Sequence, residues 1–215
     1  FAQEHVSGGH FIVAVEQENL SITGAGRIDG NRKAFYGSQE DADCERHNGK
    51  FSFSDLPADF WRPAQMIFFC ECANVLIRDV QLFNAPYWTC FLHGCDDVIV
   101  SGLRILNDQR TPNGDGIDID CCRRVTISDC LIDTGDDCIT LRGNDSPLKN
   151  KRACEYISIS NCVLHTNCNA FRIGVGNGLV RHAVISNIVF HHTRTAICIV
   201  SQYSTSSPGV QIEDI

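Results

Sequence analysis

One short pattern occurs five times in the chain after its first seventy residues. In each copy, a β-branched apolar residue stands three positions after the first residue, and apolar and polar residues then alternate. These marker residues are 23, 27, 32 and 27 residues apart, which is typical of stacked structural repeats whose loops differ in length. The five markers are Val75, Val98, Val125, Ile157 and Val184.

Strict alternation over a few residues indicates β-strands, and no segment between the repeats has a convincing helical period. Stacking such coils in parallel predicts an all-β fold, a right-handed parallel β-helix or solenoid. We expect residues 1–215 to form a single β-helix domain, with residues 31–61 as an irregular excursion or lid. Because the segment from Val210 to Ile215 begins another coil and stops, we also expect a fragment of a longer protein, truncated at both ends and uncapped.

The cysteines fit the same repeat. Their number, 13, is odd, so at least one thiol must be free within one chain. We expect them to stack as small apolar side chains inside the coils rather than to form disulfides or bind a metal, because their spacing lacks the usual zinc pattern. One expected ladder is Cys72, Cys95, Cys122 and Cys154, and a second is Cys130 and Cys162.

Charge and hydropathy narrow the classes of partner. The net charge of -8 argues against a nucleic-acid partner, since such proteins usually carry a basic face. There is no apolar run of 18 residues and no visible leader, so no membrane partner is expected. A soluble ligand or a neutral polymer fits better. Oligomeric state is open, and so is location, although free thiols favour an intracellular protein.

Three carboxylates are the main candidates for chemistry. Asn113-Gly114-Asp115 precedes Gly135-Asp136-Asp137 by about one repeat, so that Asp115 is 21 and 22 residues from the other two aspartates. If one coil separates them, the three lie side by side. Hydrolysis of a glycosidic bond with inversion needs one carboxylic acid and one carboxylate that activates water. The alternative is that all three only form turns.

A strand beside these turns also repeats, and its apolar residues are expected to point inward. Side chains on its other face would then border the carboxylates. His93 is expected to face the same side, as a minor candidate for substrate binding, whereas Trp88 and Tyr87 more plausibly pack than stack on a sugar. The residues expected on the cleft face are Asp118, Asp120, Thr140, Arg142, Arg172, Cys198 and Val200.

Four segments in order resemble the polygalacturonase family, glycoside hydrolase family 28. They are residues 19–30 (NLSITGAGRIDG), Arg62-Pro63, residues 84–88 (NAPYW) and the stretch from Asn113 to Arg142. The resemblance implies a right-handed parallel β-helix that hydrolyses pectin-type polysaccharides with inversion and without a metal or cofactor. By position, Asp136 resembles the general acid, and Asp115 and Asp137 resemble the carboxylates that activate water, with Asn113 beside them as a substrate-binding candidate.

The chain departs from the family pattern in two places. Asn169 stands where the family usually has a histidine, and Cys198-Ile199-Val200 replaces an Arg-Ile-Lys that grips a substrate carboxylate. An asparagine still hydrogen-bonds a sugar hydroxyl but does not titrate. We therefore expect a pectic substrate other than simple polygalacturonate, such as rhamnogalacturonan. Arg172 and Arg142 either bind a substrate carboxylate or stabilise the acidic cluster.

Two other functions stay open on the sequence. A β-helix that kept the carboxylates but lost the neighbouring chemistry would be a non-catalytic polysaccharide-binding or scaffold protein. A polysaccharide lyase on the same architecture would use calcium and an arginine or lysine base. Three clustered aspartates favour the hydrolase, because like charges held together need a functional reason.

Overall fold

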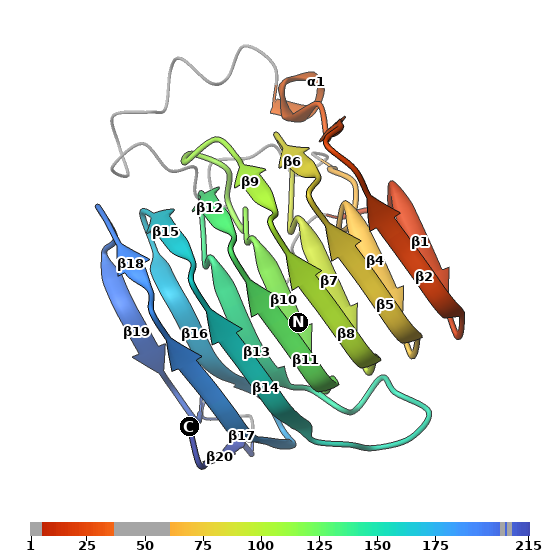
Figure 1. Cartoon of the computed structure of the whole chain (residues 1–215), viewed down its shortest axis with the longest axis vertical. Helices are drawn as coiled ribbons and strands as arrows, with labels where there is room; N and C mark the ends of the chain where they lie inside the picture. Colours follow the sequence, from red (N-terminus) through yellow and green to blue (C-terminus); the bar gives the residue numbers. More distant parts are fainter. Residues whose placement is uncertain (1–5, 37–60, 203–204, 206–207) are drawn as a thin grey trace.

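The computed structural model describes residues 6–36, 61–202, 205 and 208–215. Within these residues the chain winds into successive coils, and equivalent strands of neighbouring coils pair in parallel (Figure 1). The pairs form three long sheets that run along the molecule. The prediction of an all-β, right-handed parallel β-helix is thereby confirmed.

The three sheets are built from one strand of nearly every coil. The first sheet contains, in spatial order, β1 (Ile12–Val15), β4 (Ile67–Cys70), β7 (Cys90–His93), β10 (Ile117–Asp120), β13 (Ile139–Gly143), β16 (Asn169–Gly176) and β19 (Thr195–Ile199). The second contains β2 (Glu18–Thr23), β5 (Ala73–Arg78), β8 (Asp96–Ser101), β11 (Arg123–Ser128), β14 (Cys154–Ser160), β17 (Leu179–Ser186) and β20 (Gln211–Glu213). The third contains β18 (Val189–Phe190), β15 (Val163–Thr166), β12 (Leu131–Thr134), β9 (Arg104–Leu106), β6 (Gln81–Phe83) and β3 (Arg27–Asp29).

The repeat places the same kind of side chain at the same inward position on each coil. Val75, Val98, Val125 and Ile157 pair in register in the second sheet and are buried. The fifth marker was wrong by one residue, because Ile157 pairs with Ala183 and Val184 is 62% exposed. The pattern misled because the first residue of that coil is Val180.

Both cysteine ladders are present. Cys72, Cys95, Cys122 and Cys154 are buried in the core, and all twelve cysteines among the described residues are free thiols. Their side chains point into the interior of the coils, where cysteines on neighbouring coils are separated by the strand spacing of about 4.8 Å. In the last coil Val180 takes the equivalent position and is also buried. The ladder position therefore stays apolar, changing from cysteine to Val180 and then to Ile212 on β20.

The excursion expected at residues 31–61 is described only in part. It begins with the short helix α1 (Arg32–Tyr36), which the sequence pattern did not indicate, and residues 37–60 lie outside the described part of the chain. The first and last residues of α1, Arg32 and Tyr36, are buried. Among the described residues, no helix has the length and apolar character needed to span a bilayer.

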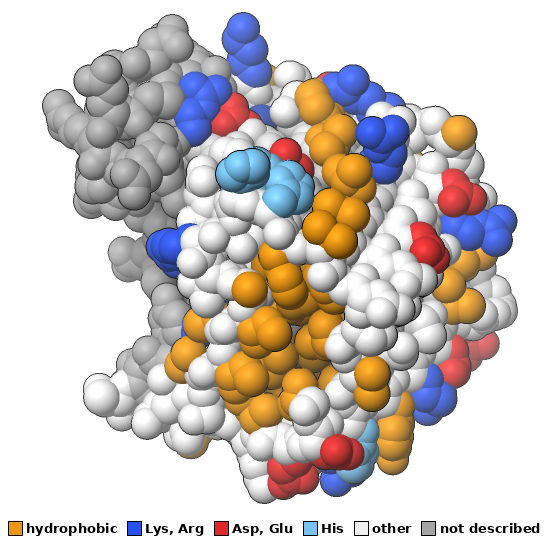
Figure 2. Space-filling view, turned by 60° about the vertical axis from the view of Figure 1, so that its left-hand side comes forward, with side chains coloured by type: hydrophobic (Ala, Val, Ile, Leu, Met, Phe, Trp, Pro, Cys, Tyr) orange, Lys and Arg blue, Asp and Glu red, His pale blue; other side chains and the backbone are white. Residues whose placement is uncertain are grey.

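The first and last coils carry exposed apolar side chains. Figure 2 shows apolar side chains gathered at the end of the molecule where β18 and β19 lie. There Val189, Ile197 and Ile199 are each more than half exposed. The segment from Val210 to Ile215 does begin another coil, since β20 pairs with β17.

Candidate active site

The turns that carry the three aspartates lie directly on one another. The amide of Gly116 donates to the carbonyl of Asp137 at 2.9 Å, and the amide of Asp136 donates to the carbonyl of Gly114 at 3.4 Å. The spacing of 21 and 22 residues is therefore one coil, as the sequence indicated.

Close backbone contacts require glycine next to Asp115 and next to Asp136. A Cβ on Gly116 would lie 2.4 Å from the carbonyl oxygen of Cys138, and one on Gly135 would lie 2.5 Å from that of Thr111. Real Cβ atoms do not approach oxygens so closely, so any other residue would separate the coils. The glycines of the two motifs thus let the aspartate turns stack.

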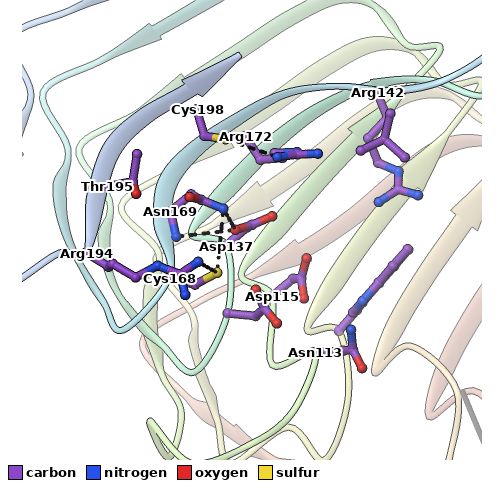
Figure 3. Close-up of a pocket in the computed structure, with 13 residues that line it drawn as sticks. Asn113, Asp115, Asp137, Arg142, Cys168, Asn169, Arg172, Arg194, Thr195 and Cys198 are labelled. Atoms are coloured by element: carbon purple, nitrogen blue, oxygen red, sulfur yellow. Dashed lines mark hydrogen bonds between the residues drawn. The ribbon is translucent and has the colours of Figure 1, made fainter. Parts of the chain in front are cut away.

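The aspartates open into a cavity of about 620 Å³ on the face of the first sheet (Figure 3). Seven of the nine candidate residues line it, whereas Asp118 and His93 do not. In Figure 3, Asp115 and Asp137 face the same space, with Arg142 and Arg172 along one side of it. The lining residues are Trp88, Asn113, Asp115, Asp136, Asp137, Arg142, Cys168, Asn169, Arg172, Val175, Arg194, Thr195 and Cys198.

Asp115 is the most deeply buried of the three. Its main chain is held by Thr89, whose amide and hydroxyl both donate to the Asp115 carbonyl at 2.9 and 2.8 Å. Its Oδ1 is buried without a hydrogen-bond partner among the described residues. Burial first, and then the neighbouring charges of Asp118, Asp136 and Asp137, raise the pKa of Asp115 well above its ordinary value.

Asn169 acts on Asp137. Its side-chain amide donates to Oδ1 of Asp137 at 2.7 Å, and its main-chain amide donates to the same oxygen at 3.3 Å. Burial and the charge of Asp136 raise the pKa of Asp137, while the hydrogen bond from Asn169 partly opposes that rise. The residue that replaces the family's histidine therefore orients one of the carboxylates.

Arg142 compensates buried charge beneath the cavity. Its guanidinium lies 3.3 Å from Oδ2 of Asp120 and 3.6 Å from Oδ1 of Asp118, and both carboxylates are fully buried. Its Cζ also lies 4.6 Å from the centre of the Trp88 ring. Burial raises the pKa of Asp118, and the nearby Arg142 opposes that rise. Asp118 is thus placed under Arg142 rather than toward a ligand.

Two groups of described residues could hold a metal ion, each with three ligand atoms within 4.8 Å of one another. One is Asp136, Asp137 and Cys168 inside the cavity. The other is His93, Asp120 and Cys121, which is buried. In the second group the ring of His93 hydrogen-bonds the carbonyl of Asn144 at 2.9 Å, and Asp120 already accepts from the Asn144 amide at 2.7 Å. That group is therefore engaged within the protein.

A second set of cations comes from the last two coils. Arg172 pairs in register with Cys198, and its Nη1 donates to the Cys198 sulfur at 3.0 Å. Arg194 donates to the Cys168 sulfur at 3.1 Å and also lines the cavity. Sequence reasoning missed Arg194, which lies in the turn before β19 and belongs to no motif. The only indication in the sequence is that Arg194 directly precedes β19, the last strand that the repeat places beside the cleft.

Arg62 fixes the loop that carries Asn113. It is buried and donates to Oδ1 of Asn113 at 2.9 Å and to the hydroxyl of Tyr36 at 2.8 Å. It also donates to the carbonyl of Pro112. The Arg62-Pro63 signature was noted in the sequence, but this positioning role of Arg62 was not.

Trp88 packs as expected and also borders the cavity. Trp88 and Tyr87 are buried and stack on each other with ring centres 5.3 Å apart. Trp88 meets Phe91 edge to face at 5.2 Å. The aromatic cluster is therefore a structural wall, one edge of which faces the ligand space.

Comparison with known proteins agrees with this geometry. The chain is 26% identical over 217 residues to a polygalacturonase from Chamaecyparis obtusa, covering 90% of this chain and 40% of that protein. A solved exopolygalacturonase from Thermotoga maritima superimposes with a TM-score of 0.73 at 25% identity, covering 94% of this chain and 50% of that one. A family 28 exopolygalacturonase from Yersinia enterocolitica shares the fold, with a TM-score of 0.67 at 19% identity over 90% of this chain and 38% of that one.

The curated relatives are longer proteins, and this chain spans less than half the length of the polygalacturonases from Chamaecyparis obtusa, Juniperus ashei and Cryptomeria japonica that it matches. The family model described as glycosyl hydrolases family 28 matches residues 2–214, nearly the whole chain. With the coil architecture, the stacked aspartate turns and this match together, the chain belongs to glycosyl hydrolases family 28.

Proposed function

We propose that this protein is an inverting glycoside hydrolase that acts on a pectic polysaccharide or oligosaccharide. The observation that carries the proposal is the convergence of Asp115, Asp136 and Asp137, from adjacent coils, on one cavity. Clustered carboxylates with raised pKa values are expected where an acid and a base must work together. The polygalacturonase names of its relatives support the same class of substrate.

In this mechanism Asp136 donates a proton to the oxygen of the glycosidic bond as that bond breaks. Asp115 and Asp137 hold a water molecule between them, and one of the two carboxylates accepts its single proton as the water oxygen attacks the anomeric carbon from the opposite face. The new bond therefore has the inverted configuration. Asp136 lies close enough for its charge to contribute to the raised pKa values of Asp115 and Asp137.

The cavity cations favour a substrate other than plain polygalacturonate. Arg142 is committed to Asp118 and Asp120, and so is less available to a substrate. Arg172 and Arg194 instead border the open space and are suited to carboxylates or to sugar hydroxyls. We infer that the substrate carries its uronate in a different position relative to the cleaved bond, as in rhamnogalacturonan or another branched pectic structure.

The experiment is reducing-sugar release from a panel of homogalacturonan, rhamnogalacturonan and neutral pectic side chains, using the parent protein and Asp136→Asn. Loss of the acid is expected to lower kcat at least about a thousandfold. The matched control is Asp97→Asn, an exposed carboxylate on the outer face of β8. Equal turnover by parent and Asp136→Asn would remove the hydrolase assignment, and binding without turnover by the parent would favour a non-catalytic protein.

A second experiment tests how the substrate is held. Arg172→Met is expected to raise KM for uronate-containing substrates about tenfold or more, because a hydrogen bond to a charged group contributes roughly 1.5–3 kcal/mol. Neutral substrates should be affected much less. Arg181→Met, which removes an arginine paired with Glu155 away from the cavity, should leave both unchanged. An equal loss on neutral and acidic substrates would show that Arg172 acts on the fold and not on a carboxylate.

A further inference from the structure

A cysteine that belongs to neither of the two ladders lies beside two of the aspartates in the cavity. Asp136 and Asp137 precede β13, and Cys168 precedes β16 on the next coil. One carboxylate oxygen from each aspartate and the cysteine sulfur all lie within 4.8 Å of one another. The three residues line the cavity, and Figure 3 shows Cys168 beside Asp137 at its edge. The cavity therefore combines a thiol with two of the carboxylates that hydrolysis would use.

The coil repeat brings these groups together. Ile139 pairs in register with Phe171. Asp136 and Cys168 each stand three residues earlier and so occupy equivalent positions on adjacent coils. Thr166 joins their main chains, because its buried hydroxyl accepts from the Cys168 amide at 3.0 Å and donates to the Asp136 carbonyl. The main chain thus holds the two side chains about one strand spacing apart.

The separations suit a small divalent ion after minor movement of side chains. Zinc binds cysteine sulfur at about 2.3 Å and carboxylate oxygen at about 2.1 Å, so its tetrahedral ligands lie about 3.3–3.6 Å apart. The three ligand atoms lie within 4.8 Å of one another, and side-chain rotations that move them by about 1 Å close the site. The side-chain amide of Asn169 donates to Oδ1 of Asp137 at 2.7 Å, and Oδ2 of the same carboxylate is the oxygen that the ion would take.

The other contacts of Cys168 fit a metal-bound thiolate. Its thiol hydrogen-bonds the carboxyl group of Asp137, and a metal ion replaces that thiol proton, which is released to solvent. Arg194 donates to the sulfur at 3.1 Å, and the side chain of Asn169 donates to it at 3.5 Å. Donors of this kind stay in place behind a bound ligand and orient it. The positive charge of Arg194 also supports the anionic sulfur that a metal requires.

A further carboxylate points to a cation in this cavity. Asp115 is 5% exposed, and its Oδ1 has no hydrogen-bond partner among the residues that the structure describes. Figure 3 shows Asp115 facing the same space as Asp137. A buried carboxylate oxygen without a partner is costly, and a divalent ion in the cavity offsets that cost.

We propose that Asp136, Asp137 and Cys168 form a binding site for a divalent ion of the zinc class, and that a bound ion stops hydrolysis. One thiolate and two carboxylates suit zinc or cadmium, whereas magnesium and calcium prefer oxygen ligands alone. An ion on the carboxylate of Asp136 keeps this residue from delivering a proton to the glycosidic oxygen, and it ties Asp137 to the metal instead of to the attacking water. Ion binding needs no catalytic activity, so only the inhibition rests on the proposed function.

Titration of the full chain with Zn²⁺ and Cd²⁺ tests the binding step. The parent should bind an ion in the cavity, and Cd²⁺ should add the ultraviolet absorption of a cadmium thiolate. Cys168→Ala and Cys168→Ser should lose that absorption and bind at least about tenfold more weakly, since even the loss of a group behind a ligand costs about 10–100-fold. The matched control is Cys198→Ala, which removes another thiol of the same cavity, one that accepts from Arg172 at 3.0 Å. It should bind like the parent.

Reducing-sugar release measures the inhibition. Zn²⁺ should lower the activity of the parent and of Cys198→Ala in proportion to the occupied site, and a chelator should restore it. The residual activity of Cys168→Ser, whatever its level, should not respond at the same concentrations. If the parent hydrolyses no pectic substrate, the proposed function fails, and the binding titration alone decides the metal site.

Three results would each overturn the proposal. They are a parent without thiolate absorption, unchanged affinity in both Cys168 variants, and full activity of the zinc-bound parent. An equal loss of affinity in Cys198→Ala would assign the binding to the cavity thiols in general and would also overturn it. Circular dichroism of each variant distinguishes loss of the site from loss of the fold.

Discussion

Two ladders run along the same coils, one inside the β-helix and one on the cleft face. The inner ladder repeats a single side chain, with Cys72, Cys95, Cys122 and Cys154 in turn. The cleft ladder changes at every coil, from Asp118 to Thr140, Arg172 and Cys198 at one register position. Inside, each coil offers the same space. On the cleft face, each coil holds a different part of the cavity, so its residues are set by chemistry rather than by repetition.

The largest effect is expected where charge lies under the cleft. Arg142→Met removes the guanidinium next to Asp118 and Asp120, which are both fully buried. Removing one partner of a buried ion pair leaves an uncompensated charge and costs roughly 3–5 kcal/mol. Urea unfolding of both proteins at neutral pH measures the loss.

Arg124→Met is the matched control for that experiment. Arg124 pairs with Asp97 at 2.6 Å on the exposed face of the second sheet, where such a pair contributes little. The free energy of unfolding should stay close to that of the parent. If both variants lost the same stability, burial would not be the reason for the importance of Arg142.

The second prediction concerns pH. Burial raises the pKa of Asp115 in the folded protein, so the folded state holds a proton at pH values where the unfolded chain has released it. Stability therefore falls as the pH rises above the unfolded pKa of about 4 toward the folded value. Asp115→Asn lacks this fall and should be more stable than the parent at pH 7, by up to about 1.4 kcal/mol for each unit of pKa shift.

Melting curves of parent and Asp115→Asn between pH 3 and pH 7 check that direction. The two should converge at the acid end and diverge as the pH rises. Asp97→Asn should do the reverse, because the hydrogen bond from Arg124 lowers the pKa of Asp97. A constant difference between Asp115→Asn and the parent at every pH would contradict the role of ionisation.

The smallest effect is expected inside. Cys122→Val replaces one member of the inner ladder with the residue that Val180 already provides at the equivalent position two coils later. Valine is about one methyl group larger than cysteine, and such overpacking of a core position costs about 1–3 kcal/mol, less than the loss expected for Arg142→Met. Urea unfolding of the parent and of Cys122→Val measures the change in the free energy of unfolding. A cost as large as that of Arg142→Met would show that the thiol hydrogen bond to the Leu92 carbonyl at 3.2 Å matters more than volume does.

The fold and the aspartate cluster could be predicted because both repeat along the chain. Alternating residues fixed the strands, and the glycines of the two turns set one coil between Asp115 and Asp136. The same reasoning missed the register of the last coil by one residue, since it relied on a cysteine that is Val180 there. A shift of one residue exchanges the two faces of a strand, which is why Val184 lies outside.

Other parts of the site depend on contacts between distant segments that no local pattern records. Arg62 reaches Asn113 across 51 residues of sequence. Arg194 enters the cavity from a turn without a motif, and Asp118 faces the cleft side as the alternation indicated but is covered by Arg142. Alternation predicts the face of a strand on which a residue lies. It does not predict whether a long side chain from the neighbouring coil covers that residue, as Arg142 covers Asp118.

The cavity draws its walls from five consecutive coils, those of β7, which contributes Trp88, and of β10, β13, β16 and β19. In a solenoid each coil contacts only its neighbours, so these five act as one exchangeable cassette. Inserting or deleting a coil outside it leaves the constellation intact, whereas an insertion within it moves the aspartates and the arginines apart by about one strand spacing of 4.8 Å. Exchanging single coils of this cassette between family members would therefore change substrate specificity one coil at a time.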